Sequence, residues 1–430
     1  MKLRTYVFFL LVMPLASLCA QSADDSLFVI KDIQIAGNDV TKEYVIRREM
    51  KLHTGDTLRL EVMKRDRDRI YNLGLFNKVD IDYSVEGRQA TVFVVVTERW
   101  YLLPYPVLGL KYHDISKLYY GISILDNNFR GCNEKISAQI GSGYDRWAAL
   151  SYQNPKLTAD DDIYFSSSII GQRVHNLSPT YGEYLNNNFD INETIGKRFG
   201  YDQNFYVTAE YQVWQVNDAL IGRTVSHSGR DAFPDLVFAY RYDTRNDVEY
   251  TTRGTLVALS FMKYGYGDNA VNTSASAFDI KHFIGIGENG GLGFRALGSF
   301  EWGGLIPPYQ HFFFGYDDRI RGYFNTIFEG EDRLGGTMEL RLPLLSPRSY
   351  DADYIPLPGF RRLRYGIYFS IFADAGTVWY RNQVLNQQPV YSGYGAGFHF
   401  LLPYGFTIRT EAAINNRGQA QAYVDFDTSF

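Results

Sequence analysis

The sequence predicts a small α+β domain followed by an all-β transmembrane barrel of about sixteen antiparallel strands. We place the first domain at residues 26–98, a linker at 99–106 and the barrel at 107–430. Three observations support this order. An apolar run at the N-terminus is too short to span a membrane. From there to Glu98 the hydrophobic pattern alternates between helix and strand periodicity, and after Pro106 only strand periodicity is found.

Residues 1–20 have the features of a secretory signal peptide. Lys2 and Arg4 precede an apolar run that ends at Leu18, and small residues follow. A helix that spans a membrane needs about 20 apolar residues, so this run is short. We expect cleavage near Cys19 or Ala20. A lipid anchor on Cys19 is the weaker alternative, because the bulky Leu18 precedes it.

The composition argues against several kinds of site. After removal of the signal, Cys132 is the single cysteine, so neither an intramolecular disulfide nor a cysteine metal cluster is expected. The seven histidines are scattered singly, and we predict no metal and no cofactor. The formal net charge of -5 is small for 430 residues, which argues against nucleic acid as a partner.

Aromatic residues and glycine indicate membrane-spanning strands. The chain has 34 Tyr, 30 Phe and 39 Gly, which is typical of strands with aromatic girdles and tight turns. Beyond the signal there is no apolar run long enough for a spanning helix. The mean hydropathy of -0.24 is compatible with a membrane protein, because only alternate residues of a barrel strand face lipid.

The N-terminal segment reads as strand, helix, helix, strand, strand. A strand at Phe28–Ile35 ends at a Gly-Asn turn, and Thr41 is positioned to cap a helix that runs to Met50. A second helix carries the charged run Lys64–Arg69 on its solvent face. The two remaining strands are predicted at Val79–Tyr83 and Thr91–Val96.

Strand-like runs recur through the rest of the chain, separated by Gly, Asn, Asp or Pro. Their count is about sixteen, an even number, as single-chain bacterial barrels require. The runs are Val107–Tyr112, Leu118–Leu125, Lys135–Gly141, Trp147–Gln153, Ile163–Gly171, Asn188–Gly196, Phe205–Gln215, Leu236–Asp243, Leu256–Tyr264, Ser274–Phe283, Leu292–Trp302, Thr337–Leu345, Tyr365–Val378, Tyr391–Leu401, Phe406–Ala413 and Ala420–Phe430.

Several of these strands have one apolar and one polar face. In the last strand Val424 and Phe426 alternate with Tyr423 and Asp425, and the strand at Phe205–Gln215 shows the same pattern. Charges confined to one face are expected of a wall between lipid and a wet lumen, since a charge in lipid is costly. A soluble β-sandwich is the alternative, but its length would be unusual.

A long connection at residues 302–337 contains the aromatic segment Phe314–Tyr323. Loops of this length are usually functional or disordered, and the aromatic content argues against disorder, so the loop should pack against the protein. Alternation in the following strands turns Glu339, Arg341 and Asp374 toward the lumen. A guanidinium from the loop can bridge the two carboxylates.

Motifs in the N-terminal segment resemble a polypeptide-transport-associated (POTRA) domain. They are Ile35–Asn38, Val45–Arg48, Gly55–Asp56 and, most specifically, Tyr71–Phe76. An unrelated α+β domain remains the alternative.

The barrel motifs resemble those of the BamA/TamA-like outer-membrane protein superfamily, whose barrel is of the bacterial surface antigen type. They are Ile320-Arg321-Gly322-Tyr323 in the long loop, Glu339–Pro343, Phe372–Trp379 with its Asp-Ala-Gly step at Gly376, and Tyr242–Asn246 with Thr252–Thr255. The resemblance implies that the loop folds into the barrel and that Arg321 contacts acidic inner-wall residues. We call this set the lumen latch: Ile320, Arg321, Gly322, Tyr323, Glu339, Arg341, Asp374 and Gly376.

Plainer interpretations of these residues exist. Arg321 can be a solvated loop arginine, and Glu339 and Asp374 can be ordinary polar residues of a lumen wall. The end of the chain resembles the C-terminal assembly signal of outer-membrane barrels, with Tyr423, Val424, Phe426 and Phe430 as its residues.

The resemblance implies an outer-membrane factor that inserts or exports β-rich proteins, with its POTRA domain in the periplasm. Its expected partners are outer-membrane lipids, unfolded β-barrel or secreted client proteins, and periplasmic or lipoprotein accessory subunits. Two rivals are an outer-membrane pore or two-partner secretion channel without insertase activity, and an outer-membrane hydrolase. We find no Gly-x-Ser-x-Gly and no phosphate-binding glycine loop, so no enzyme activity and no catalytic residue are predicted.

Overall fold

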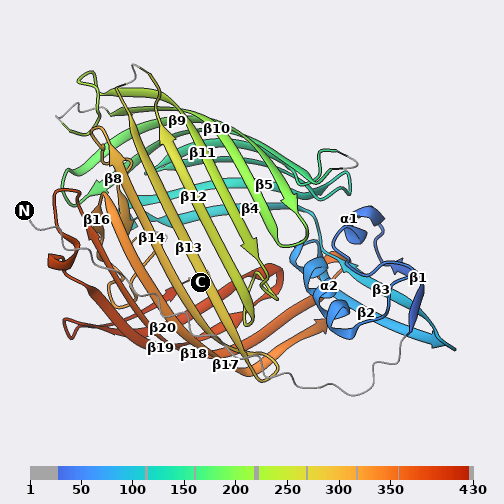
Figure 1. Cartoon of the computed structure of the whole chain (residues 1–430). Helices are drawn as coiled ribbons and strands as arrows, with labels where there is room; N and C mark the ends of the chain where they lie inside the picture. Colours follow the sequence, from blue (N-terminus) through green and yellow to red (C-terminus); the bar gives the residue numbers. More distant parts are fainter. Residues whose placement is uncertain are drawn as a thin grey trace, which may run out of the picture.

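The computed structural model describes residues 28–111, 115–158, 161–216, 222–267, 270–315, 318–356 and 358–425. The predicted signal peptide, Phe426 and Phe430 lie outside these residues. Two units follow each other along the chain, and the N-terminal one lies at one end of a large curled sheet (Figure 1). None of the described helices is long and apolar enough to cross a membrane.

The N-terminal domain is a three-stranded sheet with two helices on one face. Its strand order is β1-β3-β2, with β1 parallel to β3. The apolar faces of both helices pack on this sheet around Ile46, Ile70 and Val92, which are fully buried. The elements are β1 (Val29–Ala36), α1 (Glu43–Arg47), α2 (Leu60–Asn72), β2 (Phe76–Glu86) and β3 (Gln89–Glu98).

One prediction for this domain is wrong. The first helix is only α1, shorter than the predicted helix up to Met50, and its N-cap is Lys42 without a side-chain cap bond. The Thr41 hydroxyl instead bonds the Tyr101 hydroxyl at 2.9 Å and accepts from Asn128 Nδ2 at 2.9 Å. The Thr41 hydroxyl therefore forms tertiary hydrogen bonds instead of the helix cap that the local sequence pattern predicts.

The second unit is a sheet of sixteen strands, as predicted. Consecutive strands pair antiparallel throughout, and the sheet curls into a barrel (Figure 1). The strands are β4 (Leu102–Leu110), β5 (Leu118–Phe129), β6 (Glu134–Gly143), β7 (Arg146–Asn154), β8 (Ile163–Ser178), β9 (Gly182–Phe199), β10 (Gln203–Val216), β11 (Arg230–Asp243), β12 (Gly254–Tyr264), β13 (Thr273–Ile286), β14 (Gly290–Gly303), β17 (Asp332–Asp351), β18 (Arg362–Trp379), β19 (Tyr391–Leu401), β20 (Thr407–Asn415) and β21 (Ala420–Asp425).

The barrel is not closed by strand pairing within the described residues. The first strand, β4, and the last, β21, stand at the two ends of the strand order, and no described strand pairs with their outer edges. The sixteen-stranded barrel is therefore open between β4 and β21 in the part of the chain that the structure describes.

The boundaries depart from prediction at two places. β4 begins at Leu102, inside the predicted linker, although it contains Pro104 and Pro106. Proline is tolerated there because β4 is an edge strand, where one row of N–H groups has no ladder partner to lose. The predicted connection between the strands that end at Leu345 and begin at Tyr365 is shorter in the structure, since β17 and β18 stay paired as far as Asp351 and Arg362.

The long loop lies between β14 and β17 and contains a short hairpin, β15 (Phe312–Phe314) and β16 (Phe328–Gly330). It is the sixth of the connections at the barrel end remote from the N-terminal domain, counted along the chain. Its residues Phe314, Ile320, Tyr323 and Phe328 are buried together with Leu297 of the wall. The loop therefore packs inside the barrel, as the sequence predicted.

Candidate functional site

Arg321 lies inside the barrel on a cluster of inner-wall carboxylates. Its side chain is 4% exposed. Its Nε and Nη2 donate to both Asp374 carboxylate oxygens at 2.7 and 2.9 Å, and its backbone N–H donates to Asp374 Oδ2 at 3.0 Å. Nη1 donates to Glu339 Oε2 at 2.6 Å. The planar guanidinium thus joins β17 to β18 through one bidentate and one single charged pair.

Three more residues complete this cluster, and two of them, Glu411 and His399, belong to none of the sequence motifs. Arg321 Nη1 also donates to Glu411 Oε1 of β20 at 3.2 Å, and the guanidinium lies 3.6 Å from the ring centroid of Phe372. His399 of β19 contacts the same Glu411 oxygen through Nε2 at 3.0 Å. The alternation rule applied to Thr407–Asn415 turns Glu411 inward and was the available signal.

Arg341 supports the cluster from the side of the N-terminal domain. Its Nε donates to Glu339 Oε1 at 2.8 Å, and Nη1 donates to the Thr251 carbonyl at 2.7 Å. Glu339 therefore accepts from two arginines at once, so its buried charge is compensated by both.

The other loop residues of the lumen latch fix the position of Arg321. Ile320 is buried against Phe314, and Tyr323 donates to Asn416 Oδ1 at 2.5 Å. Gly322 has φ +99, in the left-handed region, and its carbonyl accepts from Asn415 Nδ2 at 2.9 Å. Gly376 lies beneath Ile320 and Phe314, where a Cβ would crowd both side chains. The positive φ favours glycine at position 322, and the close packing favours glycine at position 376.

The last strand contributes one residue to the same region. Tyr423 faces the lumen, donates to Glu411 Oε2 at 2.7 Å and stacks on Phe324 of the loop at 4.8 Å. Val424 points to the outer face and is exposed. Arg319 contacts the same strand through Asp425 at 3.2 Å but is only partly buried. Of the proposed assembly signal, Phe426 and Phe430 lie outside the described residues.

Gly393→Ala should loosen the loop. A Cβ on Gly393 of β19 would overlap the Arg321 carbonyl oxygen, so the loop must move away from the wall. We expect trypsin to cleave after Arg319 or Arg321 faster in this variant than in the parent protein in vesicles. The matched control is Gly171→Ala, where a Cβ meets nothing within 4 Å. Equal cleavage of both variants would contradict the packing described here.

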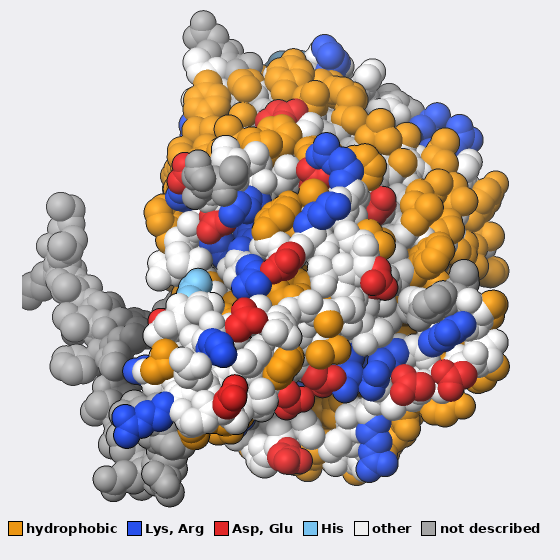
Figure 2. Space-filling view, turned by 90° about the vertical axis from the view of Figure 1, so that its right-hand side faces the viewer, with side chains coloured by type: hydrophobic (Ala, Val, Ile, Leu, Met, Phe, Trp, Pro, Cys, Tyr) orange, Lys and Arg blue, Asp and Glu red, His pale blue; other side chains and the backbone are white. Residues whose placement is uncertain are grey.

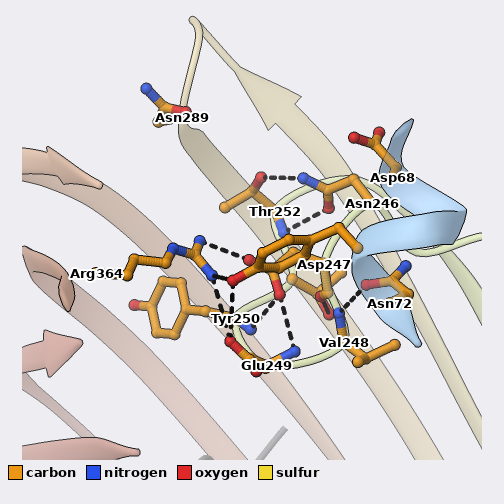
Figure 3. Close-up of polar contacts among 12 residues, drawn as sticks. Asp68, Asn72, Asn246, Asp247, Val248, Glu249, Tyr250, Thr252, Asn289 and Arg364 are labelled. Atoms are coloured by element: carbon orange, nitrogen blue, oxygen red, sulfur yellow. Dashed lines mark hydrogen bonds and ion pairs between the residues drawn. The ribbon is translucent and has the colours of Figure 1, made fainter. Parts of the chain in front are cut away.

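A second polar cluster joins the N-terminal domain to the barrel (Figure 3). Its centre is the β11–β12 turn, where Glu249 accepts from Arg99 Nη1 at 2.8 Å and from Tyr71 Oη at 3.2 Å. Arg364 of β18 donates to Asp247 Oδ2 at 2.6 Å and to Tyr71 Oη at 2.6 Å. We call these five residues the junction cluster. It connects the end of α2 to β18 and to the β11–β12 turn of the barrel.

Burial affects the pKa of two junction residues, Tyr71 of α2 and Arg99, which directly follows β3. Burial raises the pKa of the Tyr71 phenol, which therefore stays protonated and can donate to Glu249. Burial alone would lower the pKa of Arg99, but the Glu249 carboxylate outweighs it and raises the pKa. Both groups thus keep the form that their hydrogen bonds need.

Further contacts spread around the barrel end that carries the N-terminal domain. Asn72 Nδ2 donates to the Arg245 carbonyl at 3.0 Å and its Oδ1 accepts from Val248 N at 3.0 Å. Arg198 makes a bidentate pair with Glu49 at 2.6 Å for both bonds. In the view onto this end, charged side chains of both signs are spread over the face, and hydrophobic ones gather along the flanks of the barrel (Figure 2).

Comparison with known proteins identifies both units. The Omp85 superfamily domain matches residues 128–427, and the POTRA family, described as a surface antigen variable number repeat, matches residues 28–99. The outer membrane protein assembly factor BamA of Nitratidesulfovibrio vulgaris is 23% identical over 333 residues, which are 71% of this chain and 40% of that protein. The chain therefore spans less than half the length of that relative.

Two solved structures resemble the whole described chain in fold. BamA from Haemophilus ducreyi lacking POTRA domains 1-3 has a TM-score of 0.56 at 16% identity, and covers 93% of this chain and 83% of its own. CdiB from Escherichia coli has a TM-score of 0.59 at 11% identity, and covers 94% of this chain and 75% of its own. At these identities the likeness concerns the fold.

Proposed function

Because the chain belongs to the Omp85 superfamily, we propose that it inserts or exports β-rich client proteins at the bacterial outer membrane. The chain is an outer-membrane protein with an N-terminal POTRA domain. The observation that carries the proposal is the open edge of the barrel, where β4 and β21 have no partner strand among the described residues. An unpaired edge presents a row of N–H and C=O groups that an unfolded client strand can pair with.

The POTRA sheet offers a second edge of the same kind. β1 and β2 form the outer edges of the order β1-β3-β2, so an extended client segment can add to the sheet before it reaches the barrel. Several charged and polar contacts fix the domain to the barrel end. Periplasmic accessory subunits and outer-membrane lipids belong to the proposal as further partners.

We assign no catalytic chemistry to the chain. Ser178, His311 and Glu329 are residue types of a hydrolase triad and lie together at the far end of the barrel. However, both Ser178 Oγ and His311 Nδ1 bond Glu329, at 2.6 and 2.7 Å, which leaves the serine directed at the carboxylate rather than at the imidazole. This arrangement supports a role in holding the long loop.

Depletion of the protein tests the proposal. We expect a subset of outer-membrane or exported β-rich proteins to fall several-fold in abundance, because their strands lose the edge that receives them. The measurement is quantitative proteomics of the outer membrane, with inner-membrane proteins as the internal control. An unchanged proteome, together with ion conductance that appears once the long loop is removed, would favour the rival pore or secretion channel.

A further inference from the structure

A charged residue, Glu193, lies on the apolar outer face of the barrel. Along β9 the outward positions are Phe189, Ile191, Glu193 and Ile195, and all four are exposed. The register pairs Glu193 with Ser167 of β8 and with Ala209 of β10, so three outward positions stand in one row. The expectation that charges are confined to the lumen face is therefore wrong at Glu193.

The position of Glu193 along the strand places it deep in the membrane. Lys197, bonded to Asp161 at 2.6 Å, lies four positions further along β9 at the POTRA end. Asn187, in register with Arg173, lies six positions earlier at the far end. At about 3.3 Å per residue and a strand tilt of about 40°, Glu193 is on the order of 10–15 Å from each polar boundary.

The residues around Glu193 do little to stabilise the negative charge of its carboxylate. Among the described residues, its carboxylate accepts one hydrogen bond, which Ser167 Oγ donates at 2.7 Å. The short side chains of Ser167 and Ala209 flank it, and the bulkier Tyr152 and Leu236 follow on either side in the same row. Another side chain can therefore reach the carboxylate from the membrane. Ionisable groups inside a membrane are costly and mark functional contacts.

We propose that the outer face of β8–β10 around Glu193 is a docking surface for a membrane-spanning segment of another protein, which presents a lysine or arginine to Glu193. Charge complementarity determines this occupant, because lipid tails offer neither a donor nor a positive charge at this depth. This contact is separate from the open edge and from the POTRA sheet, and it goes beyond client handling.

The test uses the full chain in its own outer membrane. A photo-crosslinking residue at Ile195, which is 60% exposed, should give a discrete adduct with one protein, at a membrane-spanning stretch that carries Lys or Arg. The matched control position is Tyr394 on β19, which is 62% exposed and should give no such adduct. Glu193→Leu should reduce the adduct about tenfold, the effect of losing one such ion pair in lipid.

A partner-free measurement separates docking from stability. In phosphatidylcholine vesicles, Glu193→Leu should keep or raise the urea midpoint of the refolded barrel, because it removes a charge from lipid. The inference fails if the midpoint falls, since the bond to Ser167 would then be structural. It also fails if Glu193→Leu leaves the Ile195 adduct unchanged, or if only lipid is labelled.

Discussion

Replacing Arg321 by alanine should lower the free energy of unfolding of the barrel by about 3–5 kcal/mol. The change leaves Asp374 buried without its guanidinium partner and removes one of the two arginines that compensate Glu339. Breaking a buried charge pair from one side costs more than the pair contributes, because the remaining charge cannot regain water. The urea midpoint of the refolded protein in vesicles, read from its heat-modifiable migration, measures the loss.

Two further variants make this test specific. Arg319→Ala removes a partly exposed pair with Asp425 and should cost no more than about 1 kcal/mol. Arg321→Lys keeps the charge but cannot make the bidentate contact with Asp374, so it should recover only part of the loss. Equal losses for Arg319→Ala and Arg321→Ala would contradict the lumen latch as the site of the effect.

Deleting the POTRA domain, residues 27–98, should leave a barrel that folds but abolish client assembly. The hydrophobic core of the domain is built from its own residues, and among the residues described Tyr101 is the one hydrophobic residue beyond Glu98 that packs against it. The domain's contacts with the barrel are mainly polar. The deletion therefore exposes barrel donors and acceptors that can form hydrogen bonds with water instead. Arg364 also keeps Asp247 as a partner.

The measurement is twofold: heat-modifiable migration for the barrel, and the outer-membrane abundance of clients for the function. Glu61→Ala is the control within the domain, because this side chain is 84% exposed on α2 and faces away from the core. Glu249→Gln is the intermediate case. It keeps the domain but weakens the bond to Arg99, so it should reduce client abundance without abolishing it. Full assembly by the deleted protein would show that the POTRA domain is dispensable.

Local periodicity was sufficient to predict much of this protein. The period of two along a strand depends only on backbone geometry, so it identified the sixteen strands and turned Glu339, Arg341 and Asp374 inward before any packing was known. The length and aromatic content of the long loop likewise predicted that it must pack.

The tertiary structure determines which of the side chains that face the lumen contact one another. Glu411 and His399 join Arg321 because the sheet curls until β19 and β20 reach the loop, and no local pattern encodes that curl. The same holds for Thr41, whose hydroxyl serves the barrel contact instead of a helix cap, and for the open edge between β4 and β21. A strand specifies its two faces through its own residues, whereas its neighbours across the barrel are set by the twist and pairing of the whole sheet.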